Sequence, residues 1–234
     1  MIQPLLCLTL LASQLTACAP SPPRPLSWDT QPVGAARVTS AGEPLSPRER
    51  RARYEELVSD WTRTGECFED MEGRLFVSAT LLSPTFERAR AAELSVRQSL
   101  TAAERRREEE GLTRRAQEQR LFFVALATQE HTHNDLRPRG SVFSAHLIVG
   151  EEAIPPSWII EATVQEQLAL RFEFPFLSSL HRGYWVSFPA VPLSGLTRLR
   201  VAGIPGAVTL SWDLGGPESS HLESRAPQGR KEAS

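Results

Sequence analysis

Lysine is almost absent from the sequence: Lys231 is the only one, and all other basic residues are arginines. A coding bias toward arginine codons explains this preference, so we do not take the arginines as evidence of phosphate recognition. Basic and acidic residues number 26 and 28, which leaves a formal net charge of −2 at pH 7. No overall field therefore favours nucleic acid or anionic lipid, and we expect no nucleic-acid partner.

Several motifs that carry chemistry are also missing. The chain has no G-x-S-x-G nucleophile elbow, and no phosphate loop, dinucleotide-binding glycine fingerprint or paired-cysteine metal motif. A catalytic group can still assemble from distant positions, but no local motif indicates one. We therefore expect a domain that is not an enzyme and that holds no cofactor.

Long apolar runs are missing too, and the N-terminal run covers only residues 5–12. A membrane-spanning helix needs about 20 apolar residues, whereas the apolar core of a secretory signal peptide has about 7–15. Leu15-Thr16-Ala17-Cys18 follows, with an aliphatic residue, two small residues and a cysteine. This pattern resembles the lipobox of bacterial lipoproteins, although residues 1–4 lack the basic residue that signal peptides usually carry.

The resemblance implies cleavage just before Cys18, whose thiol then takes a diacylglycerol and whose new N-terminus is acylated. Acyl chains such as palmitate would hold the mature protein at the membrane without a spanning helix. Ala19 stands where an acidic residue signals inner-membrane retention in some lipoproteins, so we expect the outer membrane. The alternative is an ordinary signal peptide that is cleaved elsewhere.

Cysteine is scarce, with Cys7, Cys18 and Cys67 the three in the chain. Cys7 would leave with the signal peptide and Cys18 would carry lipid. Cys67 would then be alone, which excludes an intramolecular disulfide even in an oxidising compartment. We expect a buried, inert thiol, with a surface thiol that pairs between chains as the alternative.

Composition divides the chain into four parts. We expect a signal peptide at residues 1–17, a lipidated cysteine and Pro-rich tether at 18–45, a globular domain at 46–214 and a disordered tail at 215–234. Hydrophobic residues make up 41% of the chain and charged residues 23%, which are values typical of a globular protein. An extended Pro-rich tether of this length can hold the domain up to roughly 75 Å from the lipid.

Two helical regions are expected early in the domain. Ser46-Pro47-Arg48-Glu49 supplies an N-cap hydroxyl, a proline in the first turn and a glutamate three residues after the cap, and Gly65 is the expected end. The second region begins at Ser83-Pro84, and another capping box at Thr101 predicts a break and restart. The run at residues 105–110 balances acids against bases, which indicates a solvated helix face.

The remaining apolar segments predict strands. Both faces of residues 120–128 are apolar, as expected of a central strand covered on both sides. Gly203-Ile204-Pro205-Gly206 separates two alternating segments and predicts a hairpin, with Val208, Leu210 and Trp212 facing the core. The expected strands lie at residues 73–82, 120–128, 141–149, 158–164, 168–174, 184–188, 198–201 and 208–212.

About eight short strands with turn signals between them favour a β-sandwich-like domain. The strands do not alternate with helices, so a doubly wound parallel sheet is not expected. We therefore predict a mainly β, α+β domain with an N-terminal helix and a helical insertion after the first strand.

One cluster has the residue types of a metal site. In His131-Thr132-His133-Asn134-Asp135 the two rings would share a face if the segment were extended. Asp135 can add a carboxylate or hold a ring in place, and His146 or His181 can approach in the fold. The alternative, which we favour, is a polar loop between two strands, because Asn-Asp is a turn dipeptide.

Two tryptophans are weak candidates for binding residues. Trp185 faces opposite to Tyr184 and Phe188, so its strand can present a large ring to a partner or ligand. Trp158 follows Pro155-Pro156 and is likewise either a binding residue or part of the core. Core packing is the alternative for both rings, and we favour it.

These observations favour a membrane-anchored lipoprotein of the cell envelope with a non-catalytic binding or scaffolding domain. Its partner would be another envelope protein or a cell-wall component. The alternative is a secreted metal-dependent hydrolase that uses His131, His133 and Asp135.

Overall fold

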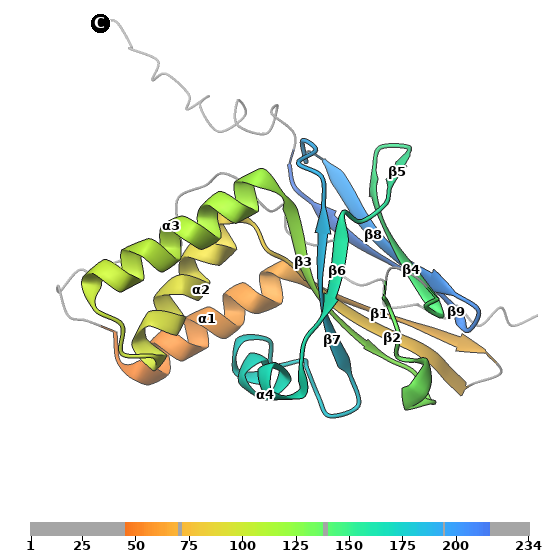
Figure 1. Cartoon of the computed structure of the whole chain (residues 1–234), viewed down its shortest axis with the longest axis horizontal. Helices are drawn as coiled ribbons and strands as arrows, with labels where there is room; N and C mark the ends of the chain where they lie inside the picture. The colour runs from red at the N-terminus through yellow and green to blue at the C-terminus, as the bar shows by residue number, and fades with distance from the viewer. Residues whose placement is uncertain (1–44, 70–71, 138–139, 194, 216–234) are drawn as a thin grey trace, which may run out of the picture.

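The computed structural model of the chain describes residues 45–69, 72–137, 140–193 and 195–215. The expected signal peptide, the lipobox with Cys18, almost all of the tether and residues 216–234 lie outside them. The described residues form four α-helices, one short 3-10 helix and nine strands in two antiparallel sheets (Figure 1). The predicted α+β, β-sandwich-like fold is confirmed.

The larger sheet has five strands in the order β1-β2-β3-β7-β6. Strand β3 lies between β2 and β7, and all of its residues are buried. This confirms the prediction of a central strand that is covered on both sides. The strands are β1 (Thr62–Glu69), β2 (Glu72–Leu81), β3 (Arg120–Ala127), β6 (Trp158–Glu161) and β7 (Arg182–Phe188).

The smaller sheet has the order β5-β4-β8-β9, and it contains the predicted hairpin. Val208, Leu210 and Trp212 are buried while Thr209 is exposed, which confirms the expected face of the last strand. The Trp212 Nε1 donates a hydrogen bond to the carbonyl oxygen of Trp61, 2.9 Å away, and ties β9 to the end of the first helix. The strands are β4 (Phe143–Val149), β5 (Glu152–Ile154), β8 (Leu196–Gly203) and β9 (Gly206–Asp213).

The prediction that Gly65 ends the first helix is wrong. Helix α1 (Pro47–Trp61) ends earlier, and Gly65 lies in β1. A Cβ atom at Gly65 would lie 2.6 Å from the Val208 Cγ1 and 3.0 Å from the Leu210 Cδ2. Glycine is needed here because β1 crosses β9 too closely for a side chain.

Helices α2 (Pro84–Arg97) and α3 (Ala102–Glu118) connect β2 to β3. The helical insertion therefore follows the second strand and not the first, because β1 was not expected. The predicted caps are present, since the side chains of Ser46, Ser83 and Thr101 each accept a hydrogen bond from the first turn of their helix. The predicted restart at Thr101 is confirmed, and the charged run at 105–110 is largely exposed.

The prediction of a strand at residues 168–174 is also wrong, because α4 (Val164–Glu173) is a helix. Thr163 and Glu166 form a capping box: the Thr163 Oγ1 accepts from the Glu166 N, and the Glu166 carboxylate accepts from the Thr163 N. This cap also ends β6 earlier than expected. Figure 1 shows α4 at the lower edge of the molecule, where its last residue, Glu173, bonds to Arg90 of α2.

Cys67 is a half-buried free thiol that packs against the edge of the core, so it is less buried than expected. Within the parts of the chain that the structure describes, no helix combines the length and apolar character needed to cross a membrane.

Candidate functional site

The histidines of the candidate metal cluster lie in the connection between β3 and β4. They form the 3-10 helix η1 (His131–His133), and both side chains are exposed. Side chains eclipse at a spacing of three in such a helix, so two rings at a spacing of two point in different directions. The His133 Nε2 lies 3.4 Å from the Glu130 Oε2.

Both oxygens of the Asp135 carboxylate accept hydrogen bonds from an arginine. The Arg137 Nε donates to Oδ1 at 2.8 Å and its Nη2 donates to Oδ2 at 2.6 Å. These hydrogen bonds keep the pKa of Asp135 below its ordinary value, against the opposing effect of burial. In the described ranges, no group of three or more His, Cys, Asp or Glu side chains is placed to hold a metal ion, so His146 and His181 do not complete a cluster.

Asn134 organises this loop. Its buried side chain accepts hydrogen bonds at Oδ1 from the Thr128 N and Oγ1, at 2.6 and 2.7 Å. Its Nδ2 donates to the Leu180 carbonyl at 3.0 Å, and the Tyr184 hydroxyl donates to the Asn134 carbonyl at 2.5 Å. These contacts clasp the loop to the start of β7 and fit the interpretation of a polar loop between two strands.

The two candidate tryptophans are half-buried. The Trp185 ring centroid lies 4.9 Å from that of Phe123, and the Arg90 guanidinium lies 5.2 Å from the Trp185 centroid. Trp158 lies on the edge strand β6 and packs against the core. Packing thus accounts for much of both rings, and Trp185 forms a wall of a buried charge cluster.

That cluster places Arg90 of α2 between two carboxylates in the interior. The Arg90 Nε donates to the Glu173 Oε2 at 2.7 Å, and its Nη1 donates to the Glu87 Oε2 at 3.1 Å. All three side chains are buried. Burial raises the pKa of Glu87, although Arg90 acts in the opposite direction. Two acids thus share one guanidinium in the interior.

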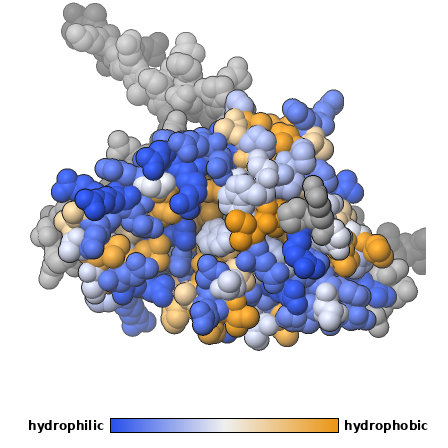
Figure 2. All heavy atoms as spheres, viewed as in Figure 1, coloured by the Kyte–Doolittle hydropathy of each residue, from blue (hydrophilic) through white to orange (hydrophobic). Residues whose placement is uncertain are grey.

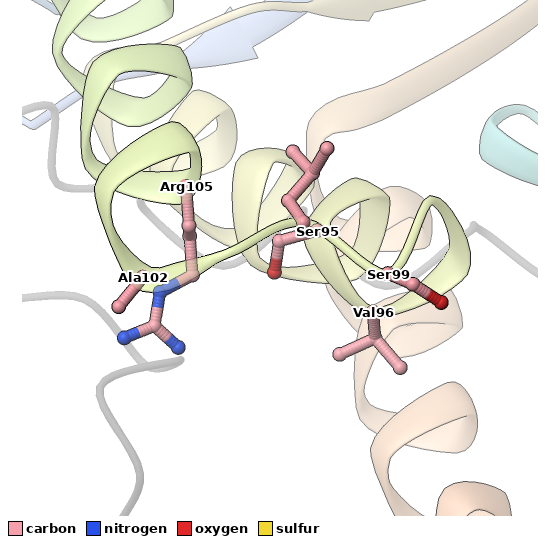
Figure 3. Close-up of a pocket in the computed structure, with 6 residues that line it drawn as sticks. Ser95, Val96, Ser99, Ala102 and Arg105 are labelled. Carbon is pink, nitrogen blue, oxygen red and sulfur yellow. The ribbon is translucent and has the colours of Figure 1, made fainter.

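Among the open hollows of the described surface, two are lined by residues outside the charge cluster. The first, of about 350 Å³, lies at the turn between α2 and α3. Figure 3 shows the Arg105 guanidinium turned away from the hydroxyls of Ser95 and Ser99, and the Ser95 Oγ donates to the Ala92 carbonyl. This hollow therefore gathers no group of side chains that can act together on a substrate.

The second hollow, of about 440 Å³, lies between α1, β1 and Pro175 and Phe176. Its floor carries threonine hydroxyls that bond to the neighbouring strand: Thr62 Oγ1 and Thr80 Oγ1 lie 2.7 Å apart, and Thr64 Oγ1 and Ser78 Oγ lie 2.9 Å apart. These hydroxyls join strands and present no activated nucleophile.

Helix α4 is fixed to the domain by polar contacts at its C-terminal end. The Arg51 Nη1 donates to the Phe172 carbonyl at 2.6 Å, and the Tyr54 hydroxyl donates to the Glu173 carbonyl at 3.2 Å. The last carbonyls of a helix lack partners within it, and a cation is favourable there. Helix α1 thus caps α4, while the Glu173 side chain pairs with Arg90.

The outward side of α4 is apolar. Val164, Leu168 and Phe172 recur every four residues and are 78%, 56% and 58% exposed; we call these three residues the α4 stripe. Such a stripe normally faces the core, but here the buried residues of the helix are Leu170 and Glu173. Figure 2 shows apolar atoms among hydrophilic ones at the lower edge, where α4 lies. Clustered exposed apolar side chains mark interaction sites.

Neither the α4 stripe nor the charge cluster was predicted. The capping box Thr163-x-x-Glu166 is a sequence signal for the helix that displays the stripe. Glu87 and Arg90 are three residues apart, which places them on one helix face. Their partner Glu173 is distant in sequence, and no local pattern indicates that contact.

The fold and these contacts define a two-sheet α+β domain with an apolar helix face turned outward. No family model matches the chain, and no curated protein or solved structure is significantly similar to it.

Proposed function

We propose that the chain is a lipid-anchored protein of the bacterial cell envelope whose domain binds another envelope component and catalyses no reaction. The observation that carries the binding function is the α4 stripe. Burying one large apolar side chain contributes about 1.5–3 kcal/mol, so three exposed side chains on one helix face provide a substantial drive for docking.

Sequence features support the anchor. The lipobox Leu15-Thr16-Ala17-Cys18 precedes a Pro-rich segment that leads into α1. Acyl chains on Cys18 would hold the protein at the membrane, and Ala19 favours the outer membrane.

The positions of the buried charge cluster and of the candidate metal ligands support a non-catalytic role. The Glu87–Arg90–Glu173 cluster is enclosed by protein, and catalytic groups must reach a substrate. The Asp135 carboxylate is held by Arg137, which leaves the hydrolase alternative with two exposed histidines.

Metabolic labelling with a palmitate analogue tests the anchor. The wild-type protein should be labelled, and Cys18→Ser should be unlabelled and either released from membranes or left as an unprocessed precursor. Unchanged labelling of Cys18→Ser would contradict the anchor.

Photocrosslinking in native membranes tests the binding surface. A benzophenone side chain at position 168 should form adducts with an envelope component, because this position lies in the α4 stripe. The matched control is position 204, since Ile204 is 95% exposed in the turn between β8 and β9. Equal yields at the two positions would show that α4 is not a binding surface.

A further inference from the structure

We propose that the α4 stripe rests on the surface of the membrane that holds the anchor, with its apolar side chains at the acyl-chain boundary. This inference rests on the proposed lipid anchor and names the partner of the α4 stripe. Three arguments favour a lipid surface: the place where the tether enters the domain, the small size of the stripe, and the charges around it.

The tether enters the domain beside the stripe. The chain between Cys18 and the domain leads into α1, which begins at Pro47. Within the first turns of this helix, the Arg51 side chain bonds to the Phe172 carbonyl. Even a fully extended Pro-rich chain of this length spans no more than roughly 75 Å, so an anchor at Cys18 would confine the stripe to the neighbourhood of the bilayer.

The α4 stripe is small for a protein–protein interface. It is sufficient for a membrane contact made by a chain that is already anchored by lipid. A stable protein–protein interface takes about 20–30 residues from each side, whereas the α4 stripe has three large apolar side chains. A lipid anchor makes the second contact intramolecular and raises its effective concentration. Membrane attachment commonly combines acyl chains with a second, weaker signal of this kind.

The charges beside the stripe suit headgroup phosphates. The Arg97 guanidinium lies 4.6 Å from the Phe172 ring centroid, and Arg171 is exposed in the last turn of α4. Of the two acids of the helix, Glu173 is paired with Arg90. Glu166 is exposed and keeps its charge at the N-terminal cap, so the basic side chains gather at the C-terminal end of the stripe. Interfacial helices have this composition, with basic side chains beside an apolar face.

The test uses the full lipidated chain in vesicles of phosphatidylethanolamine and phosphatidylglycerol. An environment-sensitive fluorophore is attached at Leu168→Cys, in a Cys67→Ser background that removes the half-buried thiol. The matched control carries it at Ile204→Cys, in the hairpin turn away from α4 (Figure 1). Nitroxide-labelled lipids should quench the label at 168 several-fold more strongly than the label at 204. Two further variants carry the label at 168. The double substitution Val164→Gln/Phe172→Gln should lower the quenching of this label, whereas Ile204→Gln should leave it unchanged.

Equal quenching at 168 and 204 in chains that carry the palmitate label would overturn the membrane contact and leave the anchor intact. A blue shift at 168 without nitroxide quenching, growing with protein density, would assign the stripe to a second copy of the chain. Protein adducts at 168 in native membranes, together with no quenching in protein-free vesicles, would assign it to a protein. Absence of the palmitate label on Cys18 would instead overturn the proposed anchor, so the two failures are distinguishable.

Discussion

Arg51 of α1 donates a hydrogen bond from Nη1 to the Phe172 carbonyl, 2.6 Å away, and so joins the start of the domain to the exposed end of α4. The Phe172 ring remains more than half exposed, with Arg97 over one side of it. An apolar side chain is thus displayed on a backbone that is already fixed. A surface of this kind loses little conformational freedom on docking.

Replacing Trp212 with alanine should lower the free energy of unfolding by about 3–5 kcal/mol. The ring is fully buried, its centroid lies 5.3 Å from that of Phe122, and its hydrogen bond to Trp61 is lost. Thr209→Ala, on the exposed side of the same strand, should change stability by less than about 0.5 kcal/mol. Urea denaturation followed by circular dichroism measures both, and an unshifted midpoint for Trp212→Ala would contradict the packing of β9.

Arg90→Met should destabilise the domain by about 3–5 kcal/mol, because it leaves two buried carboxylates without their shared cation. Adding Glu173→Gln should recover part of the loss, since one buried charge is removed. Arg106→Met on the exposed side of α3 is the control and should have little effect. Equal stability of Arg90→Met and Arg106→Met in urea denaturation would show that the cluster does not hold α2 to α4.

The difference in stability between wild type and Glu87→Gln should depend on pH. Burial raises the folded-state pKa of Glu87 above the value of 4.5 expected when it is unfolded. The stability from this group is therefore fully present below about pH 4.5 and is lost as the pH rises through the folded-state pKa. Glutamine does not ionise, so the variant should lose less stability than wild type over that range. Urea denaturation at several pH values measures the difference, and a constant difference would mean that the pKa is not raised.

Asn134→Ala should lower stability by about 1–3 kcal/mol, because it removes three hydrogen bonds that clasp the β3–β4 loop. The double variant His131→Ala/His133→Ala should be within about 0.5 kcal/mol of wild type, since both rings are exposed. Metal analysis of the same proteins should find no stoichiometric zinc. Zinc in the wild type that disappears from the double variant would instead support the hydrolase alternative.

The β8–β9 hairpin was predictable because one of its faces is buried and the other meets solvent. Val208, Leu210 and Trp212 face inward while Thr209 faces out, so apolar and polar residues alternate along the sequence of this strand. The central strand β3 was predictable for the opposite reason, because both of its faces are buried.

Helix α4 was mistaken for a strand because it carries apolar residues on two sides. Leu170 faces the core, whereas Leu168 and Phe172 face solvent. Together they place an apolar residue at every second position, which is the pattern expected of a strand. Strand β1 was missed because one side of it carries hydroxyls, with Thr62 and Thr64 bonded to β2. The charge cluster depends on where Glu173 lies in the fold, and this position follows from the unpredicted helix.

The hydrogen bond between Trp212 and Trp61 joins residues 151 positions apart. The order of synthesis makes this contact one of the last that the growing chain can complete. Contacts between distant residues require closure of a long loop, which slows folding. A chain that stops before β9 therefore lacks the strand that seals the sandwich against α1. The proposed lipid anchor requires export across a membrane, and this late contact would leave the sandwich open until its last strand has crossed.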